Sequence, residues 1–273
     1  AAAIDYLESG DLFTDFCERP GDRTLGDDRA VIGGIARLGD MPVTVIGIDK
    51  GRDLKERLDR HFGCVLPEGY RKALRLIKQA EKFNRPVICF VDTQGANCGK
   101  GAEERGAGEA IARNLYELSA VRTPIITVMI GEGGSGGALA LAVADRVWML
   151  SNAYYSVISP ESCASILFKD PKRAPEAAEH LHLTANDLVE LGIVEKKIAE
   201  PDFADADARR SFMEKLGHSL HRELKALSRL DADRLLAERT EKYRKIGRYD
   251  AYSVAGTGTA PAPHTHRCFS HGK

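Results

Sequence analysis

The feature that most constrains this fold is a repeated unit: a proline, a short apolar run and a glycine-bearing turn. The first run covers residues 87–91 and enters the polar turn of residues 92–99. The second covers residues 125–130 and enters the turn of residues 131–137. Uninterrupted apolar runs are typical of strands that are covered on both faces. With a helix expected after each turn, the repeat predicts an α/β fold with neighbouring parallel strands.

Other segments extend this α/β pattern in both directions. A helix is expected to begin at Pro67, with Tyr70 and Ile77 on its apolar face and Lys72 among the charged residues elsewhere. Thr184 is expected to cap a short helix that Gly192 ends. Further strands are expected at residues 43–48, 146–150 and 155–158, and helices at residues 102–121, 138–144, 212–227 and 235–246.

Composition excludes several classes of protein. The 39 Lys and Arg balance 40 Asp and Glu among 273 residues, so no net field favours nucleic acid or an anionic membrane. No apolar stretch approaches the roughly 20 residues of a membrane span, and no signal peptide is recognised. The six cysteines form no C-x-x-C pair, which is typical of reduced cytosolic thiols. We therefore expect a cytoplasmic protein, with one domain over residues 1–250 and a disordered tail over residues 251–273.

The turn of residues 131–137 matches three motifs. Gly131, Gly133 and Gly136 have the spacing of a dinucleotide-binding turn, but residues 150–153 lack the acid that would hold a ribose. Gly133, Ser135 and Gly137 have the spacing of a nucleophile elbow, which would need a downstream acid and histidine. The downstream histidines lie in charged helical segments typical of a solvated surface: His180, His182, His218 and His221.

The third motif is a backbone oxyanion hole. Successive glycines at a helix start expose N–H groups that have no acceptor inside the helix, and the helix dipole adds partial positive charge. Such donors stabilise an enolate or a tetrahedral oxygen without any catalytic side chain. Gly95 and Ala96, in the equivalent turn of the first unit, could supply a second donor. The alternative for either turn is a purely structural role in close strand–helix packing.

Other chemical motifs are weaker. Lys100 does not complete a phosphate-binding loop, because the glycine spacing is wrong and Gly101 stands where Ser or Thr is required. Glu103 and Glu104 are adjacent, so they suit the first turn of a helix and not an acid–base pair. The tail holds His264, His266, Cys268 and His271 without fixed geometry. No metal site is predicted.

Several longer stretches are recognisable when taken together: residues 21–23, 26–28, 30–37, 67–76, 101–114, 131–140 and 155–167. These stretches resemble the α subunits of bacterial acetyl-CoA carboxylase carboxyltransferases. The likeness extends from about residue 5 to about residue 248, in the family's order and spacing. In the turn of residues 92–99, Gln94, Asn97 and Cys98 replace two prolines and an aromatic residue that the family commonly has, and Ser162 replaces a glycine.

The resemblance implies a crotonase-like fold, a spiral of ββα units with a helical C-terminal region. It also implies transfer of a carboxyl group from carboxybiotin, carried on a biotin carrier protein, to acetyl-CoA, which gives malonyl-CoA for fatty acid synthesis. In that chemistry a biotin enolate takes the methyl proton, so no protein base is needed. A decarboxylase acting on malonyl-, methylmalonyl- or glutaconyl-CoA stays open as the alternative, as does a non-catalytic scaffold.

The resemblance further implies a set of residues and partners. The N–H groups of Gly136, Gly137 and Ala138 would hold the biotin ureido oxygen, while Gly95 and Ala96 would line the same pocket. Gly133 and Gly134 are expected to bind substrate. The partners would be a zinc-bearing β subunit in an α₂β₂ assembly, the biotin carboxyl carrier protein and biotin carboxylase. This chain would hold no tightly bound cofactor, and apolar positions around residues 125–160 would partly form the interface.

Overall fold

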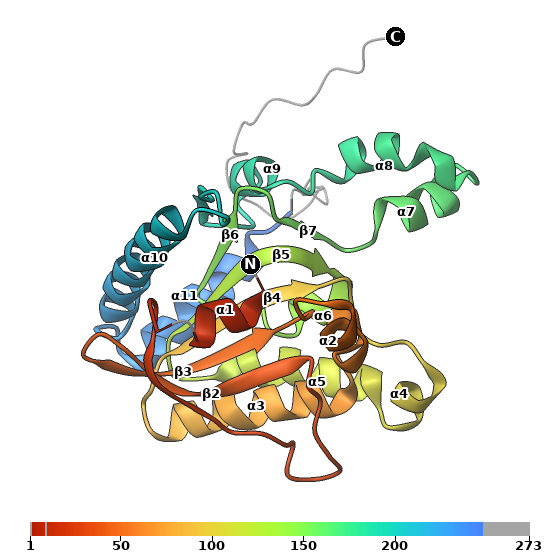
Figure 1. Cartoon of the computed structure of the whole chain (residues 1–273). Coiled ribbons are helices and arrows are strands. Elements are labelled where there is room, and N and C mark those ends of the chain that lie inside the picture. The colour runs from red at the N-terminus through yellow and green to blue at the C-terminus, as the bar shows by residue number, and fades with distance from the viewer. Residues whose placement is uncertain (1, 9, 248–273) are drawn as a thin grey trace, which may run out of the picture.

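The apolar runs of the sequence form the centre of one mixed sheet (Figure 1). The computed structural model describes residues 2–8 and 10–247, and within them eight strands pair in the order β1-β2-β3-β4-β5-β6-β8, with β7 paired to β5. β1, β2 and β3 are antiparallel, whereas the remaining pairs are parallel. The strands are β1 (Thr14–Glu18), β2 (Val31–Leu38), β3 (Met41–Ile48), β4 (Val87–Thr93), β5 (Ile125–Gly134), β6 (Arg146–Leu150), β7 (Tyr154–Ser156) and β8 (Lys196–Ile198).

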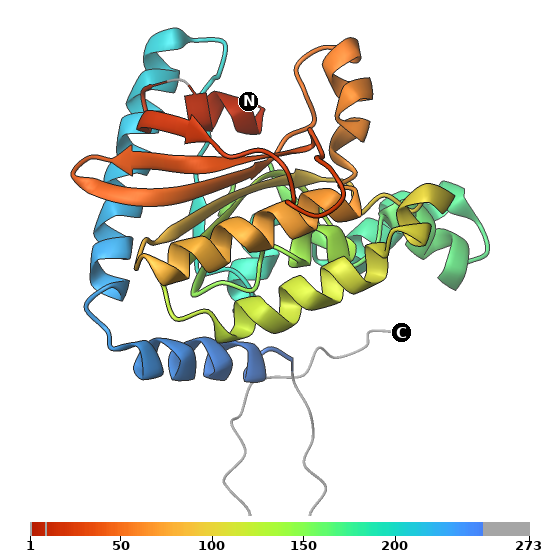
Figure 2. The same ribbon diagram turned by 90° about the horizontal axis from the view of Figure 1, so that it is seen from below.

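Helices cover both faces of this sheet. α3 and α5 lie side by side across one face, and α10 runs along one side of the body (Figure 2). α7 and α8 extend from the body as a pair (Figure 1). The helices are α1 (Ala3–Glu8), α2 (Leu54–Asp59), α3 (Pro67–Lys82), α4 (Lys100–Glu104), α5 (Ala107–Ala120), α6 (Ser135–Leu139), α7 (Pro160–Leu167), α8 (Ala174–Leu181), α9 (Ala185–Glu190), α10 (Ala206–Leu227) and α11 (Ala232–Arg244), with short 3₁₀ turns at His61–Gly63 and Pro171–Arg173.

The structure confirms the α/β prediction and the helical C-terminal region, and it adds β1 and β2. Residue propensities do not predict β2, because this strand contains two glycines and glycine is unfavourable in strands. A side chain at Gly34 would overlap the carbonyl oxygen of Cys17 in β1, and one at Gly33 would lie 2.5 Å from Leu76 of α3. These glycines therefore allow close approach of the neighbouring elements on each side.

The predicted helix over residues 102–121 is in fact two helices, α4 and α5. Gly106 separates them with φ +82°, a left-handed conformation that ends regular helix. The segment after residue 139 is also not the predicted helix, because α6 ends at Leu139 and turns follow it. By contrast, Thr184 and Asp187 form the predicted capping box at α9, and Gly192 beyond that helix has φ +71°.

One predicted surface residue of α3 is buried. Lys72 is 1% exposed, and its ammonium donates hydrogen bonds to Asp27 Oδ1 at 2.5 Å and to the carbonyl of Asp28 at 2.8 Å. The helical period placed it correctly away from Tyr70 and Ile77, but the loop of residues 19–30 folds over that side of the helix. A buried ammonium is tolerated here because it has acidic and carbonyl partners.

Helix α11 packs on the end of the sheet opposite the glycine-bearing turns. Arg239 of α11 is 2% exposed and donates to Asp145, which stands just before β6. Tyr243 donates to the carbonyl of Ala142 at 2.6 Å. Within the described ranges, no helix has the length and hydropathy to cross a membrane. The predicted tail lies outside the described residues.

Candidate active site

The two glycine-bearing turns lie at one edge of the sheet, because β4 and β5 are parallel neighbours. A side chain at Gly134 would overlap the carbonyl oxygen of Gln94, and one at Gly137 would lie 2.5 Å from the nitrogen of Ala96. Backbone therefore packs directly on backbone, which only glycine permits at these positions. Gly95 and Ala96 thus meet Gly134 and Gly137, as the equivalent places of the turns suggested.

The second turn is shorter than the sequence predicts. β5 continues past its apolar half and ends at Gly134, because its last residues pair with β7, with Gly133 opposite Tyr155. Ser135 follows with φ +52°, and α6 begins there, three residues before the predicted start. No residue separates strand from helix, and the chain changes direction at Ser135, the first residue of α6, in a left-handed conformation.

The early start of α6 decides which N–H groups lack an intrahelical acceptor. These belong to Ser135, Gly136 and Gly137, the first three helical residues. Ala138 follows as the fourth residue of the helix. A side chain at Gly136 would meet only Ile111, at 3.8 Å, so space beside this residue is more open than beside Gly137.

Hydrogen bonds hold the first turn in place. Thr93 Oγ1 accepts from the Gly95 N–H at 3.0 Å and lies 2.7 Å from the carbonyl of Gly63. Asn97 donates its N–H to Val65 at 3.0 Å, and its Oδ1 accepts from the Gly99 N–H at 2.9 Å. Asn97 thus stabilises the turn locally.

Of the two predicted donors in the first turn, one is already used. The Gly95 N–H donates to Thr93, as given above. Among the described residues no acceptor is found for the Ala96 N–H, which lies beside Gly137. The donor that this turn can offer to a ligand is therefore that of Ala96.

The backbone at Ser135 agrees with the nucleophile-elbow interpretation, but no histidine base accompanies it. Ser135 is exposed and its left-handed backbone suits an elbow. The histidine that would act as its base is not provided by the predicted candidates. His180 and His218 form hydrogen bonds with backbone carbonyls of their own helices, at Glu176 and Glu214. His221 pairs with Asp40 at 2.6 Å, and His182 ends α8. A serine–histidine pair is not formed by these residues.

A charged cluster beneath the turns was missed by the sequence reasoning. Lys50 Nζ lies 2.9 Å from Asp92 Oδ1 and also contacts Glu132. Burial together with the Glu132 charge raises the pKa of Tyr154 to about 12. A signal existed: each of the three charged residues follows or ends a predicted strand, so the rule that places the glycine turns together would place these residues together as well.

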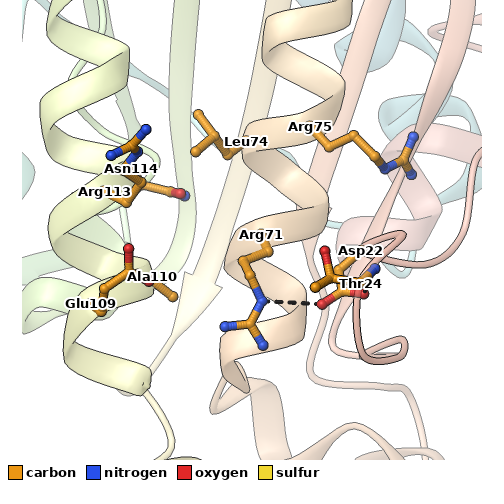
Figure 3. A pocket seen from close by; sticks show the side chains of 9 residues that line it. All are labelled: Asp22, Thr24, Arg71, Leu74, Arg75, Glu109, Ala110, Arg113 and Asn114. Carbon is orange, nitrogen blue, oxygen red and sulfur yellow. Dashed lines mark hydrogen bonds and ion pairs between the residues drawn. The ribbon is translucent and has the colours of Figure 1, made fainter. Parts of the chain in front are cut away.

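A separate groove of about 280 Å³ lies between α3 and α5 (Figure 3). Arg71 points into it and bonds Asp22 Oδ2 at 3.1 Å. The same guanidinium also donates to Glu68 and to the carbonyl of Arg105, so each of its three nitrogens donates a hydrogen bond within the chain. This groove shares no residue with the glycine-bearing turns.

The described ranges contain no cluster of three or more His, Cys, Asp or Glu side chains arranged to hold a metal ion. The tail residues His264, His266, Cys268 and His271 lie outside those ranges.

Solved structures with the same fold are carboxyltransferases and a decarboxylase. A transcarboxylase 12S structure, a hexamer with methylmalonyl-coenzyme A bound, superposes with a TM-score of 0.61 at 20% identity, covering 93% of this chain and 42% of that one. A Pseudomonas malonate decarboxylase hetero-tetramer in complex with coenzyme A gives 0.65 at 17% identity, covering 81% and 88%. The sheet, its paired glycine turns and these likenesses define a crotonase-like fold.

The sequence comparison narrows this class. The chain belongs to the acetyl co-enzyme A carboxylase carboxyltransferase-like family, whose model matches residues 1–247. It is 56% identical over 243 residues to the carboxyl transferase subunit alpha of Ruminiclostridium cellulolyticum, covering 89% of this chain and 91% of that protein. It is 54% identical over 247 residues to the carboxyl transferase subunits beta/alpha of Natranaerobius thermophilus, covering 90% of this chain and 40% of that longer protein. The resemblance inferred from the sequence is confirmed.

Proposed function

We propose that this chain is the alpha subunit of an acetyl-CoA carboxylase carboxyltransferase. It transfers the carboxyl group from carboxybiotin on a biotin carrier protein to acetyl-CoA, which gives malonyl-CoA for fatty acid synthesis. The observation that carries the proposal is the direct backbone contact of the two turns, with Gly137 against Ala96. Relatives at 53–56% identity named as carboxyl transferase subunits favour this reaction over the decarboxylase alternative.

In this proposal the chain contributes donors and shape. When the N-carboxyl bond of carboxybiotin breaks, negative charge develops on the ureido oxygen, and backbone N–H groups aimed at that oxygen stabilise it. Gly136 and Gly137 are the proposed donors at the start of α6, with Ala138 next in the same turn. Gly95, Ala96, Gly133 and Gly134 line the biotin side of the site. Such donors are fixed before the reaction, so no reorganisation is needed during it.

The proposal includes a β subunit that completes the site. The fused beta/alpha relative joins such a subunit to an alpha-like segment in one chain. Within this chain the apolar side chains of β5 and β6 are buried, so the expected interface around residues 125–160 would use the exposed part of that range. The exposed apolar side chains of that region and its continuation are Val157, Ile166 and Leu167, at the start of the α7–α8 pair and within it. We assign this pair to the contact with the β subunit.

The remaining partners belong to the same proposal. The β subunit would carry the zinc and most contacts to acyl-CoA, in an α₂β₂ assembly in the cytoplasm. Biotin carboxylase and the biotin carboxyl carrier protein would deliver the carboxyl group.

The test is the reverse reaction, malonyl-CoA plus free biocytin giving acetyl-CoA. It is run with the chain alone, with the β subunit from the same source alone, and with both together. Activity only in the mixture supports the proposal. Turnover of malonyl-CoA by this chain alone, without biocytin, would instead support a decarboxylase. Absence of activity in the mixture would refute carboxyl transfer.

A matched pair of glycine variants tests the assigned turn. Gly137→Ala places a methyl group against Ala96 and should abolish activity of the mixture. Gly108→Ala in α5 adds the same methyl group where no atom lies within 4 Å, so activity should persist. Equal activity of both variants would remove the turn from the proposed site.

A further inference from the structure

Three charged residues lie where three adjacent strands end beside the glycine turns. Lys50 follows β3 by two residues, Asp92 is in the last part of β4, and Glu132 is in the last part of β5. Lys50 Nζ is 2.9 Å from Asp92 Oδ1 and also contacts Glu132 Oε2. The side chains of Lys50 and Asp92 are only 19% and 16% exposed, so solvent screens this cluster less than a surface ion pair.

The cluster coincides with an irregularity between β4 and β5. Val91 is opposite Met129 and Thr93 is opposite Gly133, so β5 uses four residues where β4 uses two. Bulges of this kind redirect the strand that follows, and they are common beside active sites. Here the redirected segment is the glycine end of β5 that leads into α6.

Asp92 fills the inside of this bulge. Its Oδ1 accepts the Glu132 N–H at 2.9 Å, and a side chain at Gly131 would lie 2.5 Å from the same oxygen. The position of the second glycine turn therefore depends on where the Asp92 carboxylate sits. That carboxylate is held in turn by Lys50.

Lys50 also contacts the support of the first turn. A side chain at Gly63 would lie 2.8 Å from Lys50 Cγ, so the lysine stem packs against this glycine. The carbonyl of Gly63 lies 2.7 Å from the Thr93 hydroxyl, which accepts the Gly95 N–H. One side chain thus touches the supports of both turns, while its ammonium lies between two neighbouring carboxylates and offsets part of their charge.

We propose that Lys50 is a positioning residue for the carboxyl-transfer site, which sets the two glycine turns at the separation that binds biotin. This inference rests on the proposed function. Without the ammonium, Asp92 and Glu132 repel each other across the bulge, and the glycine end of β5 shifts relative to Ala96. Lys50 itself touches neither substrate.

The expected result follows from how a positioning residue acts. Lys50→Met removes the charge and keeps an unbranched apolar stem. In the reverse reaction with the β subunit present, kcat/KM for biocytin should fall by about ten- to a hundredfold, the scale of a small misplacement of reacting groups. KM for malonyl-CoA should stay unchanged, since the partner provides most acyl-CoA contacts in the proposed function. A general loss of folded protein would instead lower kcat alone, with both KM values unaltered.

Two further variants make the test specific. Lys55→Met removes an exposed lysine five residues away in α2 and should behave as wild type. Lys50→Met combined with Glu132→Gln should recover part of the loss, because only one carboxylate then remains at the bulge. Loss of packing by the stem would not be repaired by this second substitution. Melting temperatures are measured for each variant in complex with the β subunit.

The outcomes separate this inference from the function on which it depends. An inactive wild-type mixture refutes the proposed function. An active mixture in which Lys50→Met matches Lys55→Met refutes the role of Lys50 and leaves the function standing. If Lys50→Met does not fold, Lys50→Arg replaces it: the cation is kept with altered geometry, and an unchanged kcat/KM for biocytin together with an unaffected Glu132→Gln variant overturns the inference.

Discussion

Replacing Arg239 with methionine should destabilise the chain strongly, although this residue is far from the glycine turns. Its guanidinium donates to both oxygens of Asp145 at 2.8 Å, and to the carbonyls of Leu118 and Val121, each at 2.7 Å. A fifth, longer bond reaches Thr123 at 3.2 Å. The side chains of Arg239 and Asp145 are 1% and 2% exposed, so no water replaces these partners.

The magnitude follows from what the substitution leaves behind. The Asp145 carboxylate would keep only the hydrogen bond from the Ile125 N–H, at 2.8 Å, and would become a buried carboxylate without its ion-pair partner. Removing one partner of a buried ion pair costs about 3–5 kcal/mol. For a domain of this size, that corresponds to a fall in melting temperature of about 6–20 °C. The stability of Arg239→Lys should lie between those of the wild type and Arg239→Met, because an ammonium keeps the charge but cannot reproduce the planar bidentate contact.

The assay is urea and thermal unfolding followed by circular dichroism, with Arg234→Met as the matched control. Arg234 lies on the same helix and forms an exposed pair with Glu238, which contributes about 0.3–0.5 kcal/mol. The double variant Arg239→Met with Asp145→Asn should lose less than the sum of the two single losses. If Arg239→Met differs from Arg234→Met by less than about 1 kcal/mol, the account of this buried pair is wrong.

Three further predictions concern the site and the loop over α3. Thr93→Val removes the hydroxyl that holds Gly95 and should cost about 1–2 kcal/mol in unfolding free energy while raising KM for biocytin. Ser135→Gly should retain carboxyl transfer, because φ +52° suits glycine and the proposed hole uses backbone only; loss of activity with fluorophosphonate labelling of Ser135 would revive a serine nucleophile. Burial raises the pKa of Asp22, but three backbone N–H groups and Arg71 outweigh burial and bring the pKa to about 2. The stabilisation by this carboxylate is therefore present above the ordinary pKa of 3.8 and is lost as pH falls toward 2. Asp22→Asn should therefore make the unfolding free energy, measured by urea unfolding, depend less on pH in this range.

The sequence predicted what depends on local pattern. Apolar runs located β4 and β6, and the Thr184 box located α9, because hydrophobic period and cap chemistry act within a few residues. It did not predict the burial of Lys72, which depends on acidic loop residues about 45 positions away. Nor did it predict that β5 continues through Gly134, since that extension requires pairing with β7.

The site was predictable to the same extent. Parallel strands place the ends of β4 and β5 together, so a meeting of the two glycine turns followed from topology. That Gly137 packs on Ala96, and that the Gly95 N–H is already used, depends on the register between the strands. The choice of Gly136, Gly137 and Ala138 as donors stays a prediction.

The backbone contact at Gly134 and Gly137 also limits how this protein can diverge. No residue is smaller than glycine, so side-chain size at these positions cannot be adjusted in small steps, and almost any replacement is an abrupt loss. Gradual change must instead accumulate in the flanking residues, where side chains have room. Gln94, Asn97 and Cys98 belong to the turn that flanks these contacts. Natural variants that differ in substrate preference should therefore differ around the turns and keep the glycines fixed.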